Sequence, residues 1–113
     1  MQEANIFPYK PKRKIVVFCQ REAWYKGIKP YLVDVEIICH KNTNKKYESI
    51  IQKADIVWVH DKMSHSFFDK INKTTKKLNK PLLYFRGKGG KNGAIQIYNY
   101  EEKGEYINSY LSN

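Results

Sequence analysis

Apolar positions fall into short runs separated by mixed segments, and these runs predict the strands of a sheet. Residues 14–19 (KIVVFC) and 55–59 (DIVWV) are apolar almost throughout, which is typical of strands covered on both faces. Residues 33–39 (VDVEIIC) alternate apolar with acidic positions, so we expect a strand with one wet face or a place at a sheet edge. A fourth run covers residues 82–85 (LLYF). Four strands are therefore predicted, with the first and third innermost.

Helical periodicity fills each interval between these strands. Residues 44–54 carry apolar side chains at i, i+3, i+4 and i+7. Residues 64–78 begin with a serine, a residue type that caps helix N-termini, and continue with an apolar stripe. Residues 21–32 share this spacing, but Gly27 and Pro30 predict a short or broken helix there.

The alternation of strand and helix predicts a single α/β domain over residues 14–113, with a Rossmann-like or flavodoxin-like fold. Right-handed crossovers between such strands give a parallel sheet, and the predicted order is 2-1-3-4. Residues 1–13 precede the domain as an extended basic arm. After the fourth strand, GKGGKNG predicts a flexible loop and residues 101–111 a weak closing helix. The sheet has four strands, or five if residues 94–98 (AIQIY) add an antiparallel strand.

Two segments of the chain resemble a known bacterial family. They are ADIVWVHDKMSH (Ala54–His65) and KKLNKPLLYFRGKGG (Lys76–Gly90). Together with the order of elements over about residues 14–90, they look like the family catalogued as domain of unknown function 2325. The resemblance implies a Rossmann-like fold and supplies no activity. The chain departs from the family after the first strand, where Cys19–Glu22 stands in place of small residues and argues against a glycine phosphate loop.

The charge of the chain favours polyanionic partners. Its 113 residues hold 21 Lys and Arg against 11 Asp and Glu, a net charge of +10. Such an excess attracts nucleic acid through counterion release. Eighteen of the basic residues are Lys, and A/T-rich coding also produces Lys-rich chains, so both explanations stay open. The chain shows neither a signal peptide nor an apolar run long enough for a membrane span, and we expect a cytoplasmic protein.

The candidate binding site lies where the predicted strands end. In open parallel sheets, ligands bind outside the carboxyl ends of the strands near the point where the strand order reverses. Helix N-termini and arginine both favour anions there, although the simplest role of the serine that opens the third helix is a plain N-cap. The residues assigned to an anion or nucleic-acid site are Arg21, Lys62, Ser64, His65, Arg86, Lys88 and Lys91.

A second basic surface follows the third helix. Lys70, Lys73 and Lys77 share its polar face. Tyrosines gather in the last third of the chain, and two further aromatic residues lie close to Arg21. Basic residues interleaved with exposed rings suit single-stranded nucleic acid, while Trp58, Phe85 and Trp24 are expected in the core. These patterns predict a non-enzymatic nucleic-acid-binding accessory protein with low sequence specificity, for which single-stranded DNA is a candidate ligand.

Two alternatives stay open beside this interpretation. The chain is either a ligand-sensing domain for a nucleotide or another small phosphorylated anion at the strand ends, or a protein-interaction module that pairs through an edge strand or an exposed aromatic patch. A protein partner within a larger assembly is also compatible with the nucleic-acid interpretation. Catalysis has weaker support. Cys19 ends a strand as a phosphatase nucleophile would, but a buried structural thiol is the ordinary expectation for it and for Cys39. His60, Asp61 and His65 lack the spacing of a metal site, and no cofactor or metal is expected.

Overall fold

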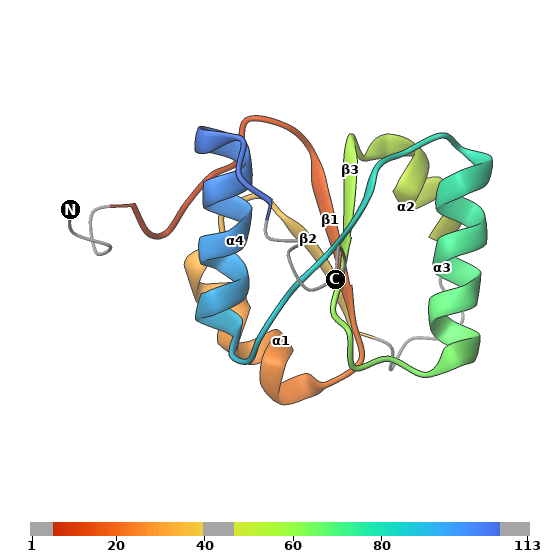
Figure 1. Cartoon of the computed structure of the whole chain (residues 1–113), viewed down its shortest axis with the longest axis horizontal. Coiled ribbons are helices and arrows are strands. Elements are labelled where there is room, and N and C mark those ends of the chain that lie inside the picture. The colour runs from red at the N-terminus through yellow and green to blue at the C-terminus, as the bar shows by residue number, and fades with distance from the viewer. Residues whose placement is uncertain (1–5, 40–46, 107–113) are drawn as a thin grey trace.

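The computed structural model describes residues 6–39 and 47–106, which form a four-stranded sheet between two pairs of helices (Figure 1). The strands are β1 (Ile15–Cys19), β2 (Glu36–Cys39), β3 (Ile56–Val59) and β4 (Leu82–Tyr84). The helices are α1 (Glu22–Ile28), α2 (Tyr47–Lys53), α3 (His65–Lys77) and α4 (Gly90–Lys103), with a 3-10 turn, η2 (Lys29–Tyr31), after α1. Helices α1 and α4 cover one face of the sheet, and α2 and α3 cover the other (Figure 1).

The strand order is β2-β1-β3-β4 and every pairing is parallel, which confirms the predicted fold. Val17 of β1 is in register with Ile37 of β2 and Trp58 of β3, so β1 and β3 are the inner strands. All their residues are buried. β2 lies at an edge, as its alternation indicated. It is shorter than predicted because Asp34, with φ of 59°, turns the backbone ahead of the strand.

The first three helices lie where the periodicity placed them. Ser64 caps α3, and its hydroxyl accepts a hydrogen bond from the Phe67 N–H at 3.3 Å. The segment 21–32 is broken as predicted, since α1 ends at Ile28 and η2 carries Pro30. The start of the second predicted helix, residues 44–46, lies outside the described residues.

The prediction for the segment after β4 was wrong. Residues 94–98 are not a fifth strand but lie inside α4, and the second half of GKGGKNG is the first turn of that helix. Gly104, with φ of 68°, caps its C-terminus, so the closing helix predicted over 101–111 does not form across that point. The buried positions of α4 that follow helical spacing are Gly90, Gly93, Ala94 and Ile97. Two of them are glycines, which a pattern of apolar side chains does not register.

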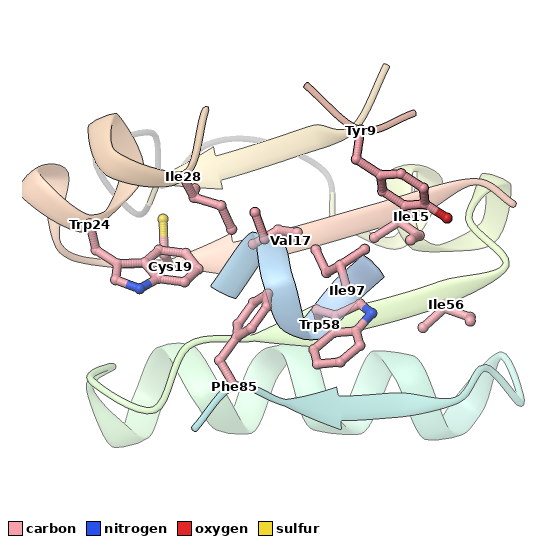
Figure 2. Packing of buried hydrophobic residues seen from close by; sticks show 11 residues of the cluster. Tyr9, Ile15, Val17, Cys19, Trp24, Ile28, Ile56, Trp58, Phe85 and Ile97 are labelled. Carbon is pink, nitrogen blue, oxygen red and sulfur yellow. The ribbon is translucent and has the colours of Figure 1, made fainter. Parts of the chain in front are cut away.

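Two hydrophobic clusters lie on the two faces of the sheet. On the α1/α4 face, Trp24, Trp58 and Phe85 are buried together, as predicted for each of them, with Val17 and Ile97 beside them (Figure 2). The cluster on the α2/α3 face joins alternate residues of the same strands to the helices above: Val16, Phe18, Ile38, Tyr47, Ile51, Ala54, Val57, Val59, Phe67 and Ile71. Each inner strand thus contributes to both clusters, which explains its continuous apolar sequence.

The extended segment ahead of β1 is held against the domain. Tyr9 is buried, bridges to Leu32, and donates its hydroxyl to a Glu102 carboxylate oxygen at 2.6 Å. Three basic residues of the predicted arm form ion pairs within the domain: Lys10 with Asp34, Lys12 with Glu102, and Arg13 with Glu101. Much of the arm's charge is therefore balanced by carboxylates, which leaves it less suited to an external polyanion.

Candidate anion site at the carboxyl edge of the sheet

The loops after β1, β3 and β4 all leave the sheet at its carboxyl edge, which is the lower edge in Figure 1. The chain passes from β1 into α1 on one face and from β3 into α3 on the other (Figure 1). These two exits diverge, so the reversal of strand order lies between the ends of β1 and β3. The predicted site therefore has the expected position in the fold.

Gln20 bridges the two diverging loops. Its side-chain carbonyl oxygen accepts a hydrogen bond from the Ser64 N–H at 2.6 Å. Ser64 in turn accepts from the Phe67 N–H, so two of the N–H groups at the start of α3 have partners within the chain. Ser64 acts as an N-cap, and little of its hydrogen-bonding capacity is left for a ligand. Gln20 directly follows β1 and was not among the residues predicted for the site.

His60 is the buried centre of this edge, and the predicted site did not include it. Its side chain is 5% exposed and stacks on Trp24, with ring centroids 4.2 Å apart and planes at 13°. Its Nε2 lies 3.5 Å from an Asp61 carboxylate oxygen. Burial lowers the pKa of His60, and the positive charges of Arg21 and Lys62 lower it further, against the opposing effect of Asp61. The imidazole is therefore neutral at neutral pH.

The charges that lower the pKa of His60 identify two of the predicted site residues near it. Arg21, after β1, and Lys62, after β3, are both close enough to His60 to act on it. Both side chains are exposed. The loops after β1 and β3 thus carry two cations within electrostatic range of one buried imidazole, and such cations suit contact with phosphate.

Arg86, after β4, is partly built into the domain. Its N–H donates to the Gln96 side-chain oxygen at 2.9 Å, and its carbonyl accepts from the Gln96 and Asn92 side-chain amides at 2.6 and 2.9 Å. The Arg86 side chain is half-buried. The α4 helix therefore anchors the end of β4, and Lys88 lies exposed in the tight loop between them, where Gly87 and Gly89 have positive φ.

The other basic residues predicted for the two binding surfaces lie in positions that are less suited to contact with phosphate. His65 is exposed at the start of α3. The Lys91 ammonium lies 5.9 Å from the centre of the Tyr31 ring, so it is directed toward η2. On the secondary basic face, Lys70 lies over the Tyr47 ring and Lys77 pairs with Glu48 at 3.4 Å. Lys73 is exposed.

The tyrosines of the last third of the chain pack on other rings. Tyr98 meets Tyr9 edge-on, Tyr84 packs on Phe68, and Tyr100 and Tyr106 both contact Trp58. Tyr110 lies outside the described residues. These rings are used in folding, so this group does not supply the open stacking surface that its clustering indicated.

Groups for other chemistry are sparse in the described part of the chain. Cys19 is fully buried, and burial raises the pKa of its thiol, so the protonated form is strongly favoured over the nucleophilic thiolate. Both cysteines are free thiols, but Cys39, on the edge strand β2, is only partly buried, so the expectation of a buried thiol was wrong for it. Within residues 6–39 and 47–106, no three His, Cys, Asp or Glu side chains are grouped to hold a metal ion. No helix within those ranges has the length and apolar character needed to cross a membrane.

Comparisons with known proteins add little. No protein-family model matches the chain. No curated protein matches it either. One solved structure that resembles it is described as a GCN5-related glucosamine N-acetyltransferase region in a fungal multi-domain GH3 β-N-acetylglucosaminidase. The two structures share a TM-score of 0.49 and 19% sequence identity. The match covers 71% of this chain but only 11% of the length of the other. The resemblance to the bacterial family of unknown function stays a prediction.

Proposed function

We propose that the protein binds the phosphate backbone of nucleic acid at the carboxyl edge of its sheet, without catalysis and with little sequence preference, in the cytoplasm. One observation carries this proposal: the Gln20–Ser64 hydrogen bond joins the two loops that carry Arg21 and Lys62, and both charges act on the buried His60 between them. Arg86 and Lys88 extend the same edge from the end of β4. Cations spaced along one edge suit successive phosphates of a strand.

The distribution of ion pairs supports this edge over other basic surfaces. Lys10, Lys12, Arg13 and Lys77 each have a carboxylate partner. Arg21, Lys62 and Lys88 have none within 4.0 Å among the described residues. A cation without an internal partner keeps its charge available for phosphate, and its binding releases counterions.

The packing of the tyrosines favours contact with phosphates over contact with bases. Without a row of open rings among the tyrosines that the structure describes, we expect little discrimination between single and double strands. Two hollows of about 800 and 750 Å³ lie along β2 and between α2 and α3, away from this edge. The edge therefore suits an extended polyanion better than an enclosed nucleotide.

A pair of charge-matched triple variants tests the proposal. The edge triple is Arg21→Gln, Lys62→Gln and Lys88→Gln. The control triple is Lys14→Gln, Lys53→Gln and Lys103→Gln, which removes three charges at the opposite, amino end of the sheet. Fluorescence anisotropy is measured with one oligonucleotide, single- and double-stranded, between about 50 and 200 mM salt. The slope of log K against log salt should fall by about 1 for each phosphate that the edge triple no longer neutralises, and stay near the parent value in the control.

Two results would contradict the proposal. Equal losses in the two triples would mean that the overall charge of the chain attracts the oligonucleotide without a site. If the parent protein binds neither oligonucleotide, its positive charge reflects only its Lys-rich composition and has no role in nucleic-acid binding. A saturable rise in melting temperature with a mononucleotide alone would instead favour the ligand-sensing alternative.

A further inference from the structure

The two edge strands of the sheet, β4 and β2, differ in whether their outer backbone groups have partners. The N–H of Tyr84 in β4 donates to the Tyr106 hydroxyl at 2.9 Å, so a side chain occupies one of the edge groups of that strand. β2 pairs with β1 on its inner side. In the described chain no strand pairs with its outer side, and the bridge between Tyr9 and Leu32 lies ahead of it. An unpaired strand edge presents N–H and C=O groups to a further strand.

A hollow of about 800 Å³ lies along the first half of β2, where both helical layers and residues 14–16 at the start of β1 line it. From the α1 side it is lined by Tyr25, Lys29 and Leu32, and from the α2 side by Ser49, Ile50 and Lys53. Its floor includes Val35, Glu36 and Ile37 of the β2 segment. We call this hollow the β2 trough. Its geometry is that of a strand edge set between two walls, which is the arrangement that accepts an added strand.

The two walls differ in chemistry because β2 alternates. Val35 and Ile37 pack toward the α1/α4 cluster, beside Leu32 and Tyr25. Ile38 belongs to the opposite cluster, and the strand period of two places Glu36 on that same side. One wall of the trough is thus mainly apolar, and the other carries a basic residue, Lys53, next to the strand.

The charges of the trough favour an acidic occupant. Its lining includes Lys14, Lys29 and Lys53 against Asp34 and Glu36. Asp34 is already paired with Lys10 at 3.4 Å. The balance that faces an incoming segment is therefore positive, and the net charge of +10 opposes the approach of a second copy of this chain.

We propose that the β2 trough binds an extended segment of a partner protein in which apolar and acidic residues alternate, and that this segment pairs with β2 as a fifth strand. Its apolar side chains pack on Tyr25, Leu32 and Ile37. Its acidic side chains lie on the side of Lys53 and Lys14, offset along the strand from Glu36 so that like charges are not directly opposite. Main-chain hydrogen bonds supply affinity, and the alternation supplies specificity. This surface is separate from the carboxyl edge and does not depend on nucleic-acid binding.

The first experiment uses a labelled synthetic peptide of about six residues, the usual strand length, with valine and glutamate in alternation. A second peptide has the same composition but groups the valines and the glutamates in two blocks. Both have equal charge, so they share any non-specific attraction to the basic chain. Anisotropy should show binding of the alternating peptide and much weaker binding of the block peptide. Equal binding of the two, or no binding of either, would overturn the proposal.

Two single variants locate the contact. Lys53 and Lys76 are both exposed lysines, on α2 and on α3, and only Lys53 lines the trough. Lys53→Glu should weaken binding of the alternating peptide about fivefold, the upper range for an exposed ion pair. Lys76→Glu should leave it near the parent value. Equal effects of the two changes would overturn the proposal.

Methylated peptides test strand pairing itself. An added strand uses the N–H groups of alternate residues, so methylation of one alternate set of amides should abolish binding while methylation of the other set is tolerated. Tolerance of both sets would show that the peptide binds through its side chains, against the proposal. Sedimentation of the parent protein reports the competing occupant: a dimer that excludes the alternating peptide from the β2 trough would assign the edge to a second copy, against the proposal.

The triple variants separate this proposal from the nucleic-acid site. The edge triple (Arg21, Lys62 and Lys88) should bind the alternating peptide like the parent. The control triple, which includes Lys14 and Lys53, should bind it less well while keeping oligonucleotide affinity. Loss of both activities in the same triple would show a single shared surface and would overturn the separation of the two sites.

Discussion

The two faces of the sheet bring their helices together by opposite means. On the α1/α4 face the helices meet backbone to backbone, because Gly90 lies against Gly27 and Ile28 with no room for a Cβ. On the α2/α3 face they are separated by large side chains, among them Tyr47 and Phe67 with ring centroids 5.7 Å apart. One face is therefore sensitive to added atoms and the other to removed atoms.

The two faces also treat buried polar groups differently. On the α2/α3 face, the buried Thr75 hydroxyl donates to the Ile71 carbonyl at 2.7 Å. On the α1/α4 face, His60 Nδ1 is buried without a hydrogen-bond partner in the described chain. An imidazole in that position is stable only while it is uncharged. The α1/α4 face is thus the one expected to respond to pH, and His60 lies where it meets the proposed anion site.

The strongest test of this comparison is Gly90→Ala. The new Cβ would overlap backbone atoms of Gly27 and Ile28, which move only if α1 and α4 separate. The free energy of unfolding should fall by more than the usual overpacking cost of about 1–3 kcal/mol. Urea unfolding measures it, with Gly104→Ala at the C-terminal end of the same helix as the control. At Gly104 a Cβ meets no atom within 4 Å, so only the strain of its left-handed φ of 68° remains, about 1–2 kcal/mol. Equal losses would disprove the close helix contact.

The converse test on the other face is Ile71→Ala. Ile71 is fully buried between α3 and the sheet, so its truncation leaves a cavity and should cost about 3 kcal/mol. Ile50→Ala, at a half-buried position of α2, should cost less in the same urea experiment. If the two changes cost the same, the α2/α3 face is not packed as described.

The smallest perturbation changes only pH. The pKa of His60 is lowered in the folded state below its ordinary value of 6.5, so the unfolded chain binds more protons in this range. The contribution of His60 to the free energy of unfolding is therefore fully present above pH 6.5, and it is lost as pH decreases through and below that value. Urea unfolding from about pH 8 to about pH 5 follows this decline. His60→Phe keeps a ring on Trp24 but does not titrate, and its stability should change less over this window. An unchanged slope would place the pH response in another group.

Strand and helix patterns in the sequence were enough to predict the sheet and most of the helices. The apolar runs that contain Val17 and Trp58 predicted buried inner strands, and the acidic alternation around Glu36 predicted an edge. Hydrophobic burial acts on local periodicity, so a single sequence carries this information. The sequence pattern also predicted that four basic residues lie at one edge of the sheet, because the carboxyl ends of parallel strands share an edge. These residues are Arg21, Lys62, Arg86 and Lys88.

Tertiary structure alone decided the contacts between distant positions. α4 was not predicted because Gly90 and Gly93 serve as packing surfaces, and that role exists only where Gly27, Ile28 and Trp24 lie opposite them. The stacking of His60 on Trp24 likewise joins residues from two elements. The pairing of Arg13 with Glu101 removed part of the predicted basic arm from the surface charge available to a partner. Local pattern records which side chains avoid water, whereas which atoms they meet depends on how the elements pack.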